Sequence, residues 1–298
     1  MHSVKSAAQL TGLSPDLLRA WERRYGVVRP RRDANGNRAY TDDDVAKLSL
    51  LAKVVALGHP IHRAAHLGLP ELERLASEAR QDDLERLAPR IVARVLEAIE
   101  AYRPDRCDEA LALALATLSP SDAVRHVLSP LLHKVGDGWH RGALSAAQEH
   151  LFSASVERLL MATIHTYLKT PRGPGILFGT PSGERHALGS LEAAFLAASR
   201  GLRCFYLGPD LPAAELAEAA RRLEVAVVAL SVVTRSNGDQ YARQIEQLST
   251  LLPADTALWI GGYTTDVFDS GSVPENCTLF STIDDYLLRL DILQSQRD

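Results

Sequence analysis

The spacing of the hydrophobic positions changes along this chain of 298 residues. Between residues 71 and 170, apolar side chains recur at the spacing of amphipathic helices. Pro104, Pro120 and the glycines between 136 and 142 interrupt the pattern, so it predicts a compact helical bundle. The expected helices span residues 71–79, 83–101, 105–118, 123–139 and 143–168.

From residue 176 onward, short apolar runs alternate with amphipathic segments. Strictly alternating strands and helices indicate a parallel sheet covered by helices on both faces, so we expect a flavodoxin-like (Rossmann-type) α/β domain over residues 174–298. The stretch 171–175 has the composition of a linker. The expected strands span 176–180, 203–207, 225–232, 257–261 and 277–281, and the expected helices span 188–200, 212–223, 239–252 and 284–294.

Residues 1–70 predict a third domain, which begins with two short helices. A helix over 3–10 and a turn at 11–13 lead to Ser14, an N-cap followed by Pro15 at the start of the helix that ends at Tyr25. Two short helices joined by a glycine-containing turn form a helix-turn-helix. We expect Leu17, Leu18 and Trp21 to pack inward and leave Arg19, Arg23 and Arg24 on one outer side.

The segment that follows predicts a wing. Residues 27–40 fit two short strands around an Asn35–Gly36 turn, and Thr41 caps a helix over 45–57 that closes at Gly58. Arginines on such a hairpin would lie against phosphates and add salt-dependent affinity for nucleic acid. The candidate DNA contacts are Arg19, Arg23, Arg24, Tyr25, Arg31, Arg32, Arg38 and Tyr40.

Charge and composition place the polyanion contact at one end only. Residues 1–60 carry ten Lys and Arg against six Asp and Glu, a net charge of +4, whereas the rest carries 23 against 31, a net charge of −8. Three isolated cysteines indicate neither a disulfide framework nor a zinc site, so we expect a reducing, cytoplasmic compartment. No apolar run has membrane-spanning length, so we expect no membrane partner.

One loop carries candidate metal chemistry. His186 comes shortly after the apolar run 176–180, so it lies at the carboxyl end of a strand, where ligands bind in open parallel sheets. Glu184 can accept a hydrogen bond from one imidazole nitrogen and leave the other free as a metal ligand. Gly189 allows the next helix to begin close to whatever the loop holds. The alternative is a solvated loop histidine.

Two further groups lie at the ends of predicted elements. Trp139 and the Glu149–His150 pair flank a junction between two helices, nine residues apart, and we expect them to converge on one pocket. The alternative places Trp139 in the core and the pair on the surface. Small hydroxyl residues close the most apolar strand, where they can donate to a ring nitrogen, and paired glycines close the fourth strand, where they admit a bulky group. The first segment contributes Ser231, Val233 and Thr234, and the paired glycines are Gly261 and Gly262.

Three motifs resemble known families. Residues 18–26 (Leu-Arg-Ala-Trp-Glu-Arg-Arg-Tyr-Gly), followed by Arg38-Ala-Tyr40-Thr41, resemble the winged helix of MerR-family transcription regulators. Glu184-x-His186-x-x-Gly189 resembles the lower-ligand loop of cobalamin-binding domains. Trp139 followed after nine residues by Glu149–His150 is similar to the upper-face motif of CarH-type (LitR-like) regulators.

The resemblance implies a light-responsive transcriptional repressor with adenosylcobalamin as chromophore, and no enzymatic activity. It would bind double-stranded operator DNA in the dark as a homo-oligomer, a dimer or tetramer, and release it when light breaks the cobalt–carbon bond. Residues 71–170 would cap the upper face of the cofactor. His186 would ligate cobalt from below, and His140 is the candidate upper ligand after photolysis. The implied cofactor contacts are Trp139, His140, Glu149, His150, Glu184, Arg185, His186, Gly189, Ser231, Val233, Thr234, Gly261 and Gly262.

Two rival interpretations remain open at the level of sequence. A corrinoid carrier or methyltransferase module shares the helical cap and the histidine loop, but has no MerR-like domain. A MerR-type regulator that uses this body for assembly alone would not need cobalamin. MerR-like proteins usually continue into a dimerising coiled coil, and we expect Pro60 and Pro70 to prevent one here.

Overall fold

The computed structural model describes residues 1–33, 36–169, 173–234, 238–262 and 273–295. The chain forms two compact units, Met1–Leu87 and Ala88–Asp298. The second unit contains both the helical layer and the parallel sheet, and the finer division into 1–70, 71–170 and 174–298 stays a proposal. No helix in the described ranges is long and apolar enough to cross a membrane.

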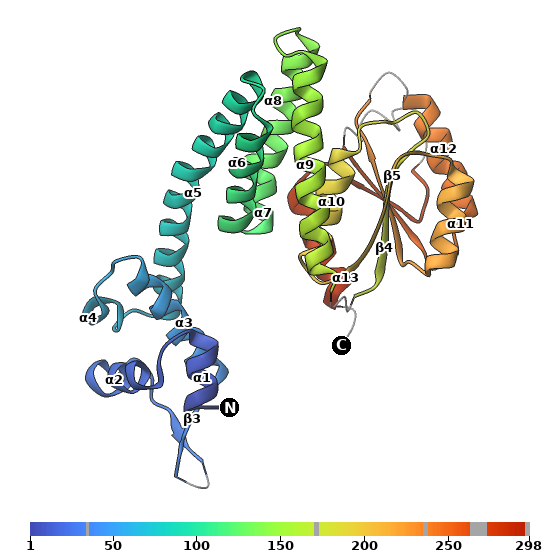
Figure 1. Cartoon of the computed structure of the whole chain (residues 1–298). Coiled ribbons are helices and arrows are strands. Elements are labelled where there is room, and N and C mark those ends of the chain that lie inside the picture. Colours follow the sequence, from blue (N-terminus) through green and yellow to red (C-terminus); the bar gives the residue numbers. More distant parts are fainter. Residues whose placement is uncertain (34–35, 170–172, 235–237, 263–272, 296–298) are drawn as a thin grey trace. The chain divides into compact units, whose positions relative to one another are not determined.

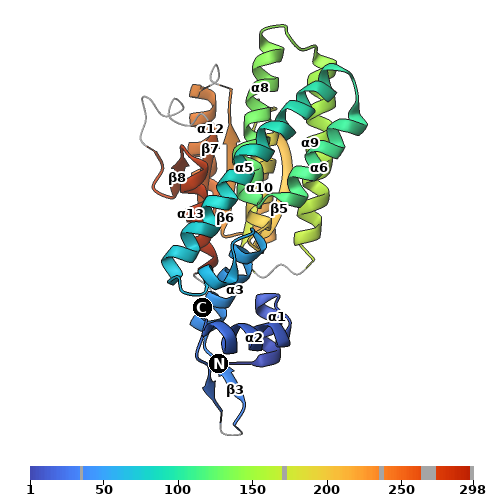
Figure 2. The same cartoon turned by 90° about the vertical axis from the view of Figure 1, so that its left-hand side faces the viewer.

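The first unit contains a helix-turn-helix and a small antiparallel sheet. Ser14 caps α2 by accepting the Leu17 N–H, and Thr41 with Asp44 forms a capping box at α3. The hairpin of β2 and β3 extends beyond the helices of this unit (Figure 2). Asn35 of the expected turn lies outside the described residues. The elements are β1 His2–Ser3, α1 Val4–Thr11, α2 Pro15–Tyr25, β2 Arg31–Arg32, β3 Arg38–Tyr40, α3 Asp42–Ala56 and α4 Ile61–Ala64.

Two details of this unit differ from expectation. The sheet has a third strand, β1, which pairs with β3 to give the order β1-β3-β2. A strand of two residues is too short to show a periodic pattern, so the sequence gives no signal for it. Leu17 lies in the first turn of α2 and is 42% exposed, whereas Leu18 and Trp21 are buried.

Helix α5 corrects the prediction of two separate helices over 71–79 and 83–101. It runs without a break from Leu69 to Glu100, a length of 32 residues, where two shorter helices were expected. Pro70 lies in its first turn, where an N–H has no intrahelical partner, so the proline does not interrupt the helix. Residues 80–82 between the two expected helices contain neither glycine nor proline, so the helix continues through them.

The helical layer of the second unit is otherwise close to the prediction. The single helix expected over 123–139 is divided into α7, a π-helical turn η1 and α8. The π-helical turn ends just before Pro130, which has no N–H to donate to the preceding turn. The elements are α6 Pro104–Thr117, α7 Pro120–Ala123, η1 Val124–Leu128, α8 Ser129–His140 and α9 Ala146–Tyr167.

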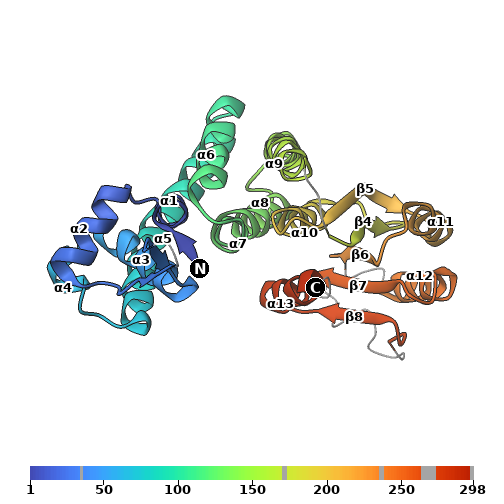
Figure 3. The same ribbon diagram turned by 90° about the horizontal axis from the view of Figure 1, so that it is seen from below.

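Five parallel strands form the sheet in the order β5-β4-β6-β7-β8. This is the flavodoxin-like order, and it confirms the expected fold class. Helices α11 and α12 cover one face of the sheet, and α10 and α13 cover the other (Figure 3). The elements are β4 Gly175–Pro181, α10 Leu188–Ala198, β5 Arg203–Leu211, α11 Ala213–Leu223, β6 Val227–Val232, α12 Gly238–Leu251, β7 Ala257–Gly262, β8 Cys277–Phe280 and α13 Ile283–Ser295.

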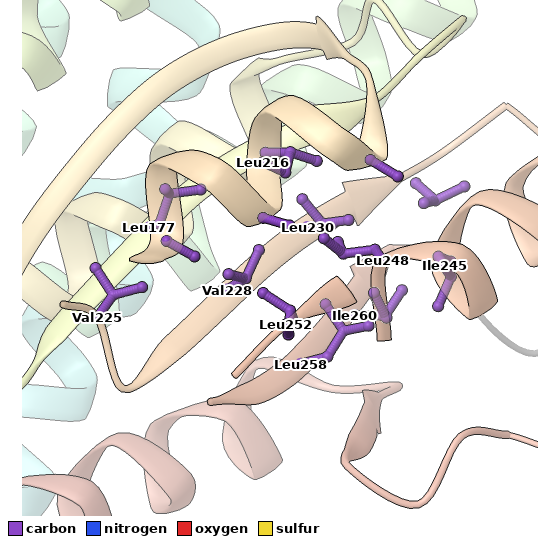
Figure 4. Close-up of a cluster of buried hydrophobic side chains, with 14 of the residues drawn as sticks. Leu177, Leu216, Val225, Val228, Leu230, Ile245, Leu248, Leu252, Leu258 and Ile260 are labelled. Atoms are coloured by element: carbon purple, nitrogen blue, oxygen red, sulfur yellow. The ribbon is translucent and has the colours of Figure 1, made fainter. Parts of the chain in front are cut away.

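Alternate residues of each strand serve the two faces of the sheet. Leu177, Leu230 and Ile260 pack with α11 and α12 in one apolar core (Figure 4). On the opposite face, α10 lies between the sheet and α9 (Figure 1). The chain reverses strand order between β4 and β6, so the loops after these two strands meet at the position where ligands bind in such sheets.

Candidate functional site

A buried carboxylate joins the loops that follow β4 and β6. Glu184 has no exposed surface. Its Oε2 accepts the backbone N–H groups of Val233 and Thr234 at 2.9 and 2.8 Å. Its Oε1 accepts the His186 N–H at 3.0 Å and the Thr234 hydroxyl at 3.1 Å. One side chain therefore holds both loops together at the reversal of strand order.

The same carboxylate orients His186. The imidazole Nδ1 lies 2.6 Å from Glu184 Oε1, so Nδ1 carries the proton and Nε2 keeps its lone pair. The His186 side chain is 61% exposed, so this nitrogen is available to an incoming ligand. The arrangement is the one predicted from the spacing of the two residues.

Hydrogen bonds and nearby charges shift the pKa values of both members of this pair. Burial by itself would raise the pKa of Glu184, but hydrogen bonds from His186, Val233 and Thr234 lower it to about 2. The hydrogen bond to Glu184 raises the pKa of His186 against the effect of burial, and the negative charge of Glu149 adds to the rise. The first turn of α9, where Glu149 lies, is therefore within electrostatic range of His186.

Residues that sequence reasoning did not single out brace the histidine loop. Asp210 has a φ of +63° and accepts the Gly183 N–H at 2.7 Å. Its own N–H donates to the Thr180 hydroxyl at 2.9 Å. Gln244 of α12 exchanges two hydrogen bonds of 2.9 Å with the backbone of Ser182. Asp210 lies in the segment 206–210, which resembles a loop of cobalamin-binding domains in the sequence, whereas Gln244 lies on an ordinary helix face and gave no signal.

The glycines permit close approaches of the backbone. A Cβ on Gly189 would lie 3.0 Å from Ser231 Oγ, so α10 begins directly against β6. Gly262 has a φ of +100°, and a Cβ there would lie 2.2 Å from the Val232 carbonyl oxygen, which excludes any other residue. Among the described residues, a Cβ on Gly261 would meet nothing within 4 Å, so they leave room for a bulky group at this strand end.

The remaining predicted residues of this layer occupy different environments. Ser231 is buried and Arg185 is exposed. The Thr234 hydroxyl, expected to meet a ring nitrogen of a ligand, donates to Glu184 and lies 3.2 Å from His186 Nδ1. Thr234 therefore supports the histidine directly.

The upper motif lies where α8 ends and α9 begins. Trp139 is 44% exposed, so the alternative that it is a core residue is wrong. Its ring centroid lies 4.9 Å from that of His140. His150 Nδ1 lies 2.7 Å from Glu149 Oε2, and the His150 side chain is 80% exposed. Trp139 and His150 are thus exposed and Glu149 is half-buried, and the convergence of the three on one pocket stays a prediction.

These features fit a corrinoid. His186 offers one nitrogen donor, and a metal already held by a macrocycle needs one axial ligand from the protein. The glycine-lined end of β7 has room for a bulky group among the described residues, and Trp139 offers an exposed aromatic surface. The assignment of the individual contacts remains a prediction.

The arginines of the recognition helix are accessible. Arg19, Arg23 and Arg24 are exposed, as are Arg31 and Arg32 of β2. They form the larger part of the predicted DNA face.

Two other candidate DNA contacts lie elsewhere than expected. Arg38 donates from Nε to both carboxylate oxygens of Glu22 at 2.9 Å, and Tyr40 has no exposed surface, with its hydroxyl 3.1 Å from Glu22. A buried side chain has no surface to offer DNA, so Tyr40 supports the wing from within.

Known protein families match both the N-terminal winged helix and the helical layer of this chain. Residues 2–67 match the family model of the MerR HTH family regulatory proteins, and residues 91–162 match a B12 binding domain. The HTH-type transcriptional repressor CarH of Myxococcus xanthus is 36% identical over 88% of each chain. CarA, an HTH-type transcriptional repressor of the same organism, is 30% identical over 82% of this chain and 80% of its own.

A solved structure shows a weaker likeness. The monomethylamine corrinoid protein of Methanosarcina barkeri covers 71% of this chain with 99% of its own, at 17% identity and a TM-score of 0.49. This likeness is too low to indicate function.

The matched B12 model spans the helices that carry Trp139, Glu149 and His150.

Proposed function

The chain belongs to the CarH-type family of B12-binding MerR regulators, and from this premise we propose that it is a light-responsive repressor with adenosylcobalamin as chromophore. Family membership makes it a DNA-binding transcriptional repressor that binds cobalamin. Its relatives are regulators and not enzymes. The winged helix argues against a corrinoid carrier, since that class has no MerR-like domain.

The observation that carries the proposal is the buried Glu184 that holds Nδ1 of an exposed His186. We assign His186 as the lower axial ligand, because Nε2 is its free nitrogen. Gly261, Gly262 and Ser231 line the sheet end that would receive the nucleotide tail. When bound, adenosylcobalamin supplies a cobalt–carbon bond that visible light breaks.

The upper motif couples this site to the helical layer. Trp139 and the Glu149–His150 pair would enclose the adenosyl group in the dark, so its departure uncovers the Trp139 ring. An uncovered aromatic surface favours movement of α8 and α9, because packed layers respond to lost contacts by shifting as units. His140, exposed beside Trp139, is the candidate upper ligand after photolysis.

We infer that this movement disrupts a homo-oligomer, a dimer or tetramer, that binds operator DNA in the dark. Several winged helices held in one assembly bind repeated sites much more tightly than one alone. A shift of the helical layer would separate them, and the repressor would leave the operator.

Size-exclusion chromatography of adenosylcobalamin-loaded protein tests the switch. We expect an oligomer in darkness and a smaller species after green light, with operator binding lost in parallel. His186→Ala should weaken cofactor retention or shift the visible spectrum. His140→Ala should impair the stability of the lit species alone. An elution volume indifferent to light in the wild type refutes the switch, and a normal light response in His140→Ala refutes only the role of that residue.

A further inference from the structure

The recognition helix carries an acid among its arginines. Glu22 lies on α2 between Arg19 and Arg23, on a face expected to meet phosphates. Its side chain is only 17% exposed, and both carboxylate oxygens accept from Arg38 Nε at 2.9 Å. Oε2 also accepts the Tyr40 hydroxyl at 3.1 Å. Glu22 is therefore turned toward strand β3 and away from solvent.

The chemistry of this cluster makes it persistent. Burial, followed by the nearby charge of Glu22, raises the pKa of Tyr40 to about 12, so its hydroxyl stays a donor at neutral pH. The hydrogen bond and charge of Glu22 raise the pKa of Arg38 as well. Charge-assisted bonds of this kind are about twice as strong as those between neutral groups.

The sheet transmits the position of β3 to the wing. In the antiparallel register, Ala39 lies opposite Arg31, and Arg38 lies opposite Arg32. Strand β2 has only two residues, and a hairpin that short has little stability of its own. The attachment of β3 to α2 through Glu22 therefore sets where the exposed Arg31 and Arg32 lie relative to the exposed arginines of α2.

We propose that Glu22 is a positioning residue for DNA binding, which fastens the wing to the recognition helix so that both engage the duplex together. It does not itself contact DNA. Two binding elements held at a fixed geometry gain affinity over the same elements joined loosely. This inference rests on the DNA-binding role of the family and is independent of the light response.

Simple charge reasoning predicts the opposite sign, which makes the proposal testable. Removal of an acid near phosphates reduces repulsion and should tighten binding. Our proposal predicts that Glu22→Gln weakens it. Asp16→Asn is the matched control, because Asp16 lies on the same helix, is exposed and pairs with Arg19 at 3.3 Å. It removes the same charge without touching the wing.

The assay uses the full-length protein loaded with adenosylcobalamin in the dark. Binding is measured against a duplex of its own upstream region and a random duplex of equal length, at several salt concentrations. We expect Glu22→Gln to lose about tenfold in affinity for the upstream duplex. Asp16→Asn should bind at least as tightly as the wild type. Tighter binding by Glu22→Gln with a steeper salt slope would overturn the proposal, since it would mean that Glu22 only masks Arg38.

A double-mutant cycle with Arg38→Gln separates positioning from contact. If Arg38 acts through Glu22, the double variant is no weaker than either single variant. Additive losses would show that Arg38 binds DNA itself and would overturn the proposal. Thermal unfolding of Glu22→Gln at the wild-type temperature shows that the variant is folded. If Glu22→Gln does not fold, Tyr40→Phe is used instead. It removes only the hydrogen bond from Tyr40 to Glu22, and it should lose less DNA affinity than is expected of Glu22→Gln. No binding by the wild type would refute the DNA-binding role itself.

Discussion

Glutamine at position 184 keeps the shape of the Glu184 side chain and removes one acceptor. Oε2 accepts two backbone N–H groups, and Oε1 accepts the His186 N–H, the Nδ1–H and the Thr234 hydroxyl. An amide NH₂ must face one of these two sets of donors. On the Oε1 side it donates to Nδ1, and the proton then moves to Nε2, where it blocks ligation. On the Oε2 side it opposes the N–H groups of Val233 and Thr234.

The magnitude follows from these contacts. Loss of the partner that orients a metal-ligating histidine costs 10- to 100-fold in metal affinity, or about 1.4–2.8 kcal/mol. A buried N–H left without an acceptor costs a further ~1–3 kcal/mol of folding stability. We therefore expect Glu184→Gln to retain cobalamin at least about tenfold less tightly and to unfold at lower denaturant concentration.

The dependence on pH gives a second readout. The pKa of Glu184 is lowered to about 2 from 4.5, so its ionised form contributes stability above pH 4.5 that is lost as the pH falls toward 2. The variant lacks this acid-induced loss. The pKa of His186 is raised by Glu184, so ligation by its neutral form strengthens as the pH rises through that value. In Glu184→Gln the increase of cobalamin affinity with pH should occur at lower pH, because the carboxylate that raises the pKa of His186 is gone.

The assay titrates apoprotein with cobalamin between pH 5 and 8 and follows the visible spectrum. Glu192→Gln is the control, because it replaces a buried acid of the same unit, on helix α10, whose Oε2 accepts the Ser129 hydroxyl at 2.9 Å. Wild-type affinity and an unchanged pH profile in Glu184→Gln would refute the role of Glu184 and, with it, the choice of His186 nitrogen.

Three other changes have defined outcomes. Burial raises the pKa of Glu192 to about 8, so the folded chain keeps a proton that the unfolded chain loses from pH 4.5 upward. The wild-type protein should therefore lose about 3 kcal/mol of stability between pH 4.5 and 7 in thermal melts, and Glu192→Gln should abolish this loss. Gly262→Ala should destabilise by ~2–4 kcal/mol in urea unfolding, because its Cβ would lie 2.2 Å from a carbonyl oxygen, and wild-type stability would contradict the backbone geometry. Arg23→Ala should weaken DNA binding and reduce the salt slope by about one, with cobalamin uptake unchanged; normal operator binding would mean that the recognition helix is misplaced.

Local signals in the sequence determined most elements of this protein. The caps at Ser14 and Thr41 involve bonds within three residues, so both caps are identified from the sequence alone, although α3 begins at Asp42, three residues before the expected start. Alternating apolar runs and helical segments likewise specify the parallel sheet. The pairing of Glu184 with His186 was predictable for the same reason, since only Arg185 lies between them.

Only the tertiary structure decided what depends on distant partners. Glu184 meets Val233 and Thr234 across 49 and 50 residues, and Glu22 meets Arg38 and Tyr40 across 16 and 18. These contacts form because strand order and sheet register bring the segments together, and neither periodicity nor capping carries that information. The burial of Tyr40 has the same origin, because a tyrosine on a short wing strand is compatible with either face until the helix beside it is placed.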